Sequence, residues 1–221
     1  MHSLISKLLP GPVVTDGAWG TQLQAQGLRP GECPDAWNLS HPDRVESVAR
    51  AYVAAGSQII LTNTSGALQL QLANHGLAER VTAINRAGVE ISRRAAAGRA
   101  LVFASIGPTG KMLVTEETTE DELRAVFEEQ TAALAEAGAD ALLLETFADL
   151  DEARIAIIAA KKTGLPVVAS FVFDSGPHLD RTTMGATPEQ AVAAAGATFI
   201  GGCCGTSPAF IAAVAKAVRP S

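Results

Sequence analysis

One unit recurs three times along the chain: an alanine-rich helix that stops at Ala-Gly and is followed by a short apolar run. Glycine is favourable directly after a helix because it adopts the left-handed backbone conformation at little cost. An unbroken apolar run bounded by glycine predicts a strand covered on both faces, as in a parallel sheet. The three runs, residues 58–63, 141–145 and 198–203, each end at polar residues capable of chemistry.

Three further segments, residues 13–14, 101–105 and 166–173, bring the number of expected strands to six. Helical patterns lie between them: Thr119 and Glu122 form a capping box, and Ser40 is predicted to cap the helix that follows it. The alternation of strands and helices predicts an α/β fold with a parallel sheet.

Chain length leaves two architectures open. A (β/α)8 barrel of the TIM-barrel type needs eight strands and usually about 250 residues, so this chain of 221 residues is about two units short. An open parallel α/β sheet also accommodates six strands. No long linker rich in Gly, Ser or Pro divides the sequence, and a single domain over residues 1–221 is expected.

Composition excludes several other classes of protein. Hydrophobic residues make up 48% of the chain and charged residues 18%, which excludes a disordered chain. A net charge of −6 without a cluster of Lys or Arg argues against nucleic acid or a membrane surface as the main partner. The apolar runs are too short for a membrane span or a secretory signal. Three cysteines make no disulfide framework, so a cytoplasmic location is expected.

Two adjacent cysteines, Cys203 and Cys204, lie among glycines at the end of the last expected strand. Two thiolates there can hold one soft metal ion, and zinc suits them because it can keep an open position for a substrate. A buried structural pair is the alternative. A catalytic zinc site ordinarily has three protein ligands. The third is left open among Cys33, His178, a partner chain and none.

Other polar residues follow the earlier strands. Asp16 and Gly17 lie in a glycine-rich turn, where a carboxylate and backbone N–H groups could hold the ammonium and carboxylate of an amino acid. Glu145 ends a buried strand, a costly position unless its charge is paired or used. Asn63 could contact a substrate or satisfy loop backbone. The sequence thus predicts a substrate site formed by Asp16, Gly17, Asn63 and Glu145.

Taken together, six motifs closely resemble the homocysteine S-methyltransferase family. They are DGAWGT at 16–21, GECPDAWN at 31–38, LTNT at 61–64, SIGP at 105–108, LLET at 143–146 and GGCCGT at 201–206. The resemblance implies a (β/α)8 barrel with zinc held by three cysteines at strand ends. Cys203 and Cys204 match two of these ligands, and Asp16 and Glu145 match positions that hold the amino group of homocysteine.

The sequence departs from the family at one place. The family's first zinc cysteine lies in a Gly-x-Asn-Cys segment on the sixth strand, and another β/α unit follows it. Here residues 193–197 lead directly into the last strand, and the sequence contains no such segment. An internal deletion that joins two similar Ala-Gly-Ala stretches explains both the missing cysteine and the shortage of strands. It predicts a barrel shortened to about six β/α units.

The resemblance implies zinc-dependent methyl transfer to the thiolate of homocysteine, or of a related thiol, giving methionine. The loops after the third and fifth expected strands are predicted to shape the approach of the methyl donor. The donor itself is left open among a corrinoid, betaine, S-methylmethionine and S-adenosylmethionine. The alternatives are a metal-free remnant without activity, which could form a homo-oligomer, and another α/β-barrel enzyme that acts on a small acid.

Overall fold

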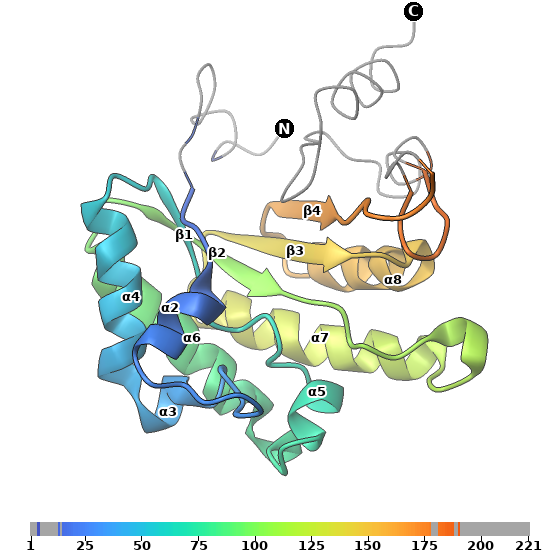
Figure 1. The fold of residues 1–221 in the computed structure, drawn as a ribbon, viewed down its shortest axis with the longest axis horizontal. Coiled ribbons are helices and arrows are strands. Elements are labelled where there is room, and N and C mark those ends of the chain that lie inside the picture. The colour runs from blue at the N-terminus through green and yellow to red at the C-terminus, as the bar shows by residue number, and fades with distance from the viewer. Residues whose placement is uncertain (1–3, 5–12, 14, 178–180, 188–189, 191–221) are drawn as a thin grey trace, which may run out of the picture.

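The computed structural model describes residues 4, 13, 15–177, 181–187 and 190 of the chain (Figure 1). A parallel sheet lies at its centre, with four strands in the order β1-β2-β3-β4. The strands are β1 (Ile59–Leu61), β2 (Leu101–Ile106), β3 (Ala141–Phe147) and β4 (Val167–Phe171). Thr15 forms an isolated parallel bridge with Ile59, so the segment before the first described helix runs beside β1. The α/β class with a parallel sheet is confirmed.

Four long helices alternate with the strands and pack in chain order, each against the next. They are α4 (Pro42–Ala54), α6 (Val81–Ala96), α7 (Glu120–Glu136) and α8 (Leu150–Lys161). Shorter elements fill the connections: α2 (Trp19–Ala25), α3 (Trp37–Ser40), α5 (Gln69–Ala73) and the 3₁₀ turns η1 (Ala78–Arg80) and η2 (Leu113–Thr115). None of the described helices is long and apolar enough to cross a membrane.

The strand order bears on the two predicted architectures. In an open doubly wound sheet the strand order reverses at a switch point, and helices cover both faces. In the described part of this chain the strands follow one another in chain order without a reversal. Because crossovers between parallel strands are right-handed, all four long helices lie on one face. Parallel strands in chain order, with all their helices on one face, are the arrangement found in a segment of a (β/α)8 barrel.

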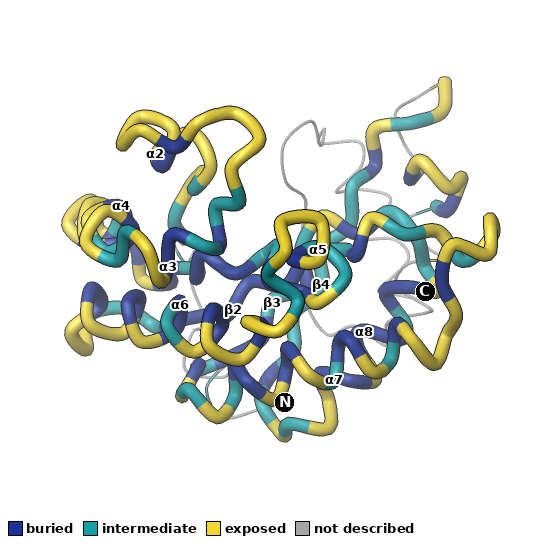
Figure 2. Tube along the Cα trace, turned by 90° about the horizontal axis from the view of Figure 1, so that it is seen from below, coloured by how far each residue is buried: buried dark blue, intermediate teal, exposed yellow. Residues whose placement is uncertain are grey.

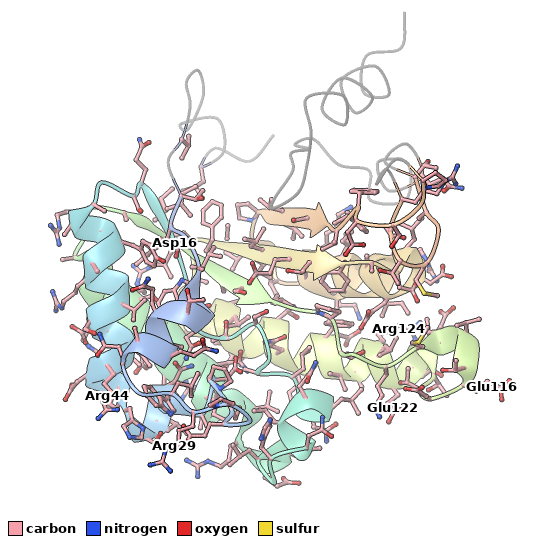
Figure 3. All side chains as sticks on the ribbon, in the orientation of Figure 1. Asp16, Arg29, Arg44, Glu116, Glu122 and Arg124 are labelled. Atoms are coloured by element: carbon pink, nitrogen blue, oxygen red, sulfur yellow. The ribbon has the colours of Figure 1, made fainter. Side chains whose placement is uncertain are left out.

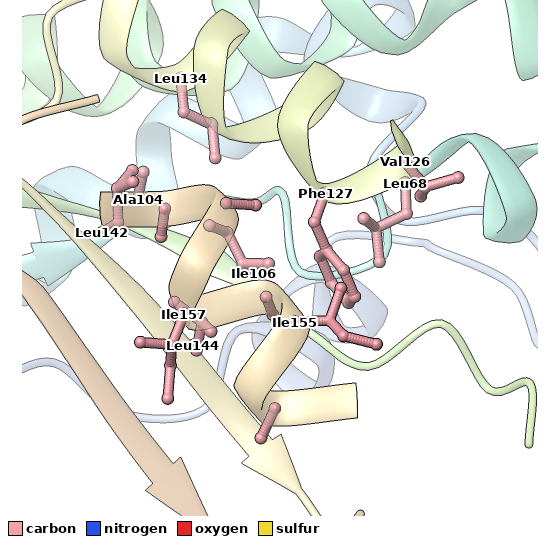
Figure 4. Close-up of a cluster of buried hydrophobic side chains, with 14 of the residues drawn as sticks. Leu68, Ala104, Ile106, Val126, Phe127, Leu134, Leu142, Leu144, Ile155 and Ile157 are labelled. Carbon is pink, nitrogen blue, oxygen red and sulfur yellow. The ribbon is translucent and has the colours of Figure 1, made fainter. Parts of the chain in front are cut away.

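The helix-covered face of the sheet holds the main core. Phe127 and Leu134 of α7 and Ile155 of α8 pack with Leu142 and Leu144 of β3 (Figure 4). Figure 2 shows that the helices turn their buried residues toward the sheet and their exposed residues outward. Each Å² of apolar surface that this layer removes from water stabilises the fold by roughly 25 cal/mol.

The alternate residues of the strands form a second apolar cluster on the face opposite the helices. It contains Ile59, Phe103 and Ala141, with Leu143 and Val168 packed against them. Side chains alternate between the two faces along a strand. Residues 105 and 145 therefore belong to this second face, beyond Phe103 and Leu143 toward the carboxyl ends of their strands.

The predicted helix boundaries are confirmed in two cases and wrong in one. Gly56 and Gly138 follow α4 and α7 with φ of 100° and 90°, as the Ala-Gly units predicted. Thr119 caps α7 by accepting a hydrogen bond from Glu122 N–H at 3.2 Å. Ser40 does not cap α4: it is the last residue of α3, its hydroxyl donates to Ala36 O, and α4 begins after His41.

Candidate functional site

Asp16 lies where the chain enters α2 (Figure 3) and reaches the carboxyl end of β1. Its Oδ2 accepts hydrogen bonds from Leu61 N–H at 2.7 Å and from Trp19 Nε1–H at 2.8 Å. The glycine-rich turn around it lets the chain fold back, so that a side chain three residues before the start of α2 meets the end of a strand. Asp16 is therefore fixed at the carboxyl edge of the sheet.

Glu145 is a second carboxylate at this edge. Burial raises the pKa of the Asp16 carboxyl, the hydrogen bonds from Leu61 and Trp19 lower it, and the negative charge of Glu145 raises it; the net direction is upward. Neither carboxylate takes part in any of the ion pairs found in the described part of the chain. Two partly buried carboxylates that act on one another without a cation suit a positively charged ligand group.

The strand β3 contains an irregularity at Glu145. Leu144 pairs with Ala169 but Phe147 pairs with Phe171, so β3 has one extra residue there. Thr146 takes a φ of 68°, and Phe147 returns to the helix-covered face, where its ring lies 6.1 Å from that of Phe127. A bulge of this kind re-aims a side chain. Here it places Glu145 at the edge while the core contact of Phe147 is kept.

Gly17 and Asn63, the other two predicted substrate residues, lie nearby in different surroundings. Gly17 is exposed, and a Cβ at this position would lie 3.2 Å from the Tyr52 hydroxyl. The Asn63 amide nitrogen donates to Pro34 O at 2.8 Å and to Asn38 Oδ1 at 3.1 Å. This is the loop-satisfying role that the sequence left open for Asn63. A substrate contact by either residue stays a prediction.

Among the predicted metal residues, Cys203, Cys204 and His178 lie outside the described residues. Cys33 packs against a small apolar cluster, and its thiol donates to Asp35 Oδ2 at 3.8 Å. Burial raises the pKa of the Cys33 thiol, and the charge of Asp35 raises it further. Both effects disfavour the thiolate of Cys33 while no metal ion is bound. Over the part of the chain that the structure describes, no three His, Cys, Asp or Glu residues form a group that could hold a metal ion.

Two supports of the site were not predicted from the sequence. Glu152, in the first turn of α8, is buried, and its Oε1 accepts from Thr109 N–H at 2.7 Å and from the Thr109 hydroxyl at 2.6 Å. Gly107 donates its N–H to Ser65 O at 2.8 Å, and a Cβ on Gly107 would also lie 2.8 Å from that oxygen. These contacts fix the loop after β2. The Ser-Ile-Gly-Pro-Thr motif marks that loop but does not reveal its partners.

A cavity of about 590 Å³ opens between the loops that follow β2, β3 and β4. Among the residues that the structure describes, its lining includes two carboxylates, Asp149 and Asp151, and no Lys, Arg or His. The other lining residues are Leu113, Val114, Leu150, Met184, Gly185, Ala186 and Gln190.

A singly wound parallel sheet with polar side chains at its carboxyl edge defines a class, the α/β proteins whose small-molecule sites lie at the strand ends. The family is then identified by sequence. The homocysteine S-methyltransferase family matches residues 13–196 and 180–218. The chain belongs to this family, as the six motifs predicted.

Individual relatives agree with the family match. The chain is 30% identical over 225 residues to a methionine synthase of Mycobacterium tuberculosis, covering 93% of this chain but 19% of that protein. It is 31% identical over 215 residues to betaine–homocysteine S-methyltransferase 1 of Sus scrofa, covering 93% of this chain and 75% of that one. The metallated form of the homocysteine methyltransferase MmuM from Escherichia coli has a similar fold, with a TM-score of 0.74 at 23% identity, covering 96% and 98% of the two chains.

Proposed function

We propose that the protein transfers a methyl group to the sulfur of homocysteine, or of a related thiol, giving methionine. One observation carries the proposal: in a member of this family, the carboxylates of Asp16 and Glu145 lie at the carboxyl edge of the sheet, act on one another electrostatically, and form no ion pair with any described residue. The hydrogen bonds from the described residues reach Oδ2 of Asp16 and Oε1 of Glu145. The second oxygen of each carboxylate can therefore accept from the ammonium group of an amino acid.

Zinc forms part of this proposal, with Cys203 and Cys204 as two of its ligands. A free thiol has a pKa near 8.5 and is mostly protonated at neutral pH, although the thiolate is the nucleophile. Bound zinc lowers the pKa of a coordinated thiol and so supplies that thiolate. The third ligand stays open among Cys33, His178, a partner chain and no protein ligand; the half-buried Cys33 thiol would have to give up its hydrogen bond to Asp35 in order to bind the metal.

We also propose that the fold is a (β/α)8 barrel shortened to about six units within a single domain over residues 1–221. The one-sided helix layer supports this proposal. So does the overlap of the two family matches, because residues 180–196 are matched in both segments. A deletion between two similar stretches is expected to give such an overlap. The composition supports a cytoplasmic protein that binds small molecules, without nucleic acid or membrane as partner.

A metal-free remnant without activity is the second candidate. It is favoured by one specific observation, the missing Gly-x-Asn-Cys segment, because a zinc site with two protein ligands is one short of the usual three.

The test measures zinc content and methionine formation on the full chain. Homocysteine would be supplied with betaine, S-methylmethionine, S-adenosylmethionine or a methylated corrinoid in turn. We expect near-stoichiometric zinc, methionine with one of these donors, and loss of both zinc and product in C203S. Glu145→Gln should raise the KM for homocysteine about 10-fold or more, because a hydrogen bond to a charged group is lost. The matched change Glu90→Gln, on the exposed face of α6, should leave it unchanged.

Two results decide against this function. Zinc-free protein that forms no methionine with any donor would favour the inactive remnant. Turnover that persists in C203S and in the presence of a chelator would exclude the zinc-dependent reaction.

A further inference from the structure

Ser105 lies near the carboxyl end of β2, beyond the point where β1 can pair with it. The ladder between these strands ends with Leu61 opposite Phe103. Two threonine hydroxyls that follow β1 replace the missing ladder bonds. Ser105 N–H donates to Thr62 Oγ1 at 3.0 Å, and Thr64 Oγ1 donates to Ser105 O at 2.7 Å.

These hydrogen bonds form a closed circuit. The hydroxyl oxygens of Thr62 and Thr64 are 2.5 Å apart. The single hydroxyl proton of Thr64 is given to Ser105 O, so Thr62 must donate to Thr64. The circuit therefore runs from Ser105 N–H through Thr62 and Thr64 back to Ser105 C=O. All three residues are buried. In such surroundings hydrogen bonds polarise and strengthen one another.

The Ser105 hydroxyl is the one polar group of this residue outside the circuit. It donates to Oε1 of Glu145 on the neighbouring strand, on the face opposite the helices. Thus the backbone of Ser105 is fixed from β1, and its side chain is directed at a candidate binding residue.

Glu145 is therefore held in two ways. Its backbone is placed by the bulge, where the left-handed conformation of Thr146 is costly for a residue with a Cβ. One oxygen of its side chain is held by Ser105. The β2–β3 ladder extends past Ser105 to the pair Ile106 and Leu144, so the sheet does not need this hydrogen bond for its continuity.

We propose that Ser105 is a positioning residue, which holds the Glu145 carboxylate in the orientation that binds the ammonium group of the substrate. The inference rests on the proposed function and deepens it: the circuit of Ser105, Thr62 and Thr64 determines selectivity for thiols that carry an amino group. The hydroxyl occupies Oε1, which leaves Oε2 free for the ligand beside Asp16.

Two ligands that differ only in the amino group test this role. Homocysteine and 4-mercaptobutanoate, which lacks that group, would be titrated calorimetrically into the zinc-loaded full chain. Ser105→Ala should weaken the binding of homocysteine about 10-fold, because the hydrogen bond that the Ser105 hydroxyl donates to the Glu145 carboxylate is lost. It should change the affinity for 4-mercaptobutanoate by less than about 2-fold. Ser105→Thr should restore most of the loss.

Ser92→Ala is the matched control. Ser92 is also buried, and its hydroxyl donates to Leu61 O at 3.0 Å, at the helix-covered side of the same edge. We expect Ser92→Ala to leave the ratio of the two affinities unchanged. An equal loss for both ligands in Ser105→Ala, or no loss for either, would overturn the inference.

The position of Glu145 separates this inference from the proposed function. If the unaltered protein binds neither ligand, the proposed function fails, but crystal structures of this protein and of Ser105→Ala still decide the role of Ser105. A Glu145 carboxylate displaced only in the variant supports the inference. An unmoved carboxylate refutes it.

Discussion

Asp35 is a buried carboxylate between two loops of the site. Its Oδ1 accepts from Gly66 N–H at 3.0 Å, and burial raises its pKa from 3.8 to about 6. The folded protein thus binds this proton more tightly than the unfolded chain does. The contribution of Asp35 to the free energy of unfolding therefore increases as the pH falls from about 7 to about 4, by up to about 3 kcal/mol.

Asp35→Asn removes this titration while keeping the shape of the side chain. We expect the free energy of unfolding of the unaltered protein to rise relative to that of Asp35→Asn as the pH is lowered from 7.5 to 4.5. Denaturant titrations at several pH values measure this difference. Asp43→Asn, on the exposed first turn of α4, is the matched control for the loss of one carboxylate. If the free energies of unfolding of Asp35→Asn and of the unaltered protein change with pH in parallel, the pKa of Asp35 is not raised by folding.

At the scale of elements, Glu152 joins the loop after β2 to the first turn of α8. Burial raises the pKa of its carboxyl, and the two hydrogen bonds from Thr109 lower it, with a net rise. Glu152→Ala removes the acceptor for both Thr109 donors, so we expect a loss of about 2–3 kcal/mol in unfolding free energy. Amide hydrogen exchange at Thr109 should become faster in the same variant.

Asp151→Ala provides the comparison for Glu152, because Asp151 occupies the same turn of α8 with its side chain 73% exposed. Asp151→Ala is expected to lower the free energy of unfolding by less than about 1 kcal/mol. Equal costs for the two variants would mean that the Thr109 contact does not stabilise the loop.

The strands and the two carboxylates could be predicted because each depends on local sequence. Apolar runs after Ala-Gly predict β1 and β3. Asp16 is predicted from the glycine-rich turn after residues 13–14, and Glu145 from its place at the end of the run 141–145. The contact of Ser105 with Glu145 could not be predicted, because it depends on the register between β2 and β3 and on an extra residue in β3. The burial of Asp35 likewise depends on a loop that lies 31 residues further along the chain, at Gly66.

At the scale of the whole molecule, the order of the strands brings the loops after β2, β3 and β4 together around the 590 Å³ cavity. Two of these loops are the ones that the sequence predicted to shape the approach of the methyl donor. The charged residues among the described residues of the lining are acidic. Such a cavity favours a donor with a positive charge, a sulfonium or a quaternary ammonium group, over a neutral or anionic one.

Asp149→Asn tests this preference without disturbing the fold. Asp149 caps α8, with Oδ1 accepting from Asp151 N–H at 2.8 Å, and asparagine caps helices equally well. For a cationic donor we expect the KM to rise by about 3- to 10-fold, more strongly at low salt, because one partly exposed charge is removed. The KM for homocysteine should stay constant, since Asp16 and Glu145 are unchanged. The exposed change Asp121→Asn, on α7, controls for net charge. A donor KM that does not respond to Asp149→Asn or to salt would place donor binding elsewhere on the molecule.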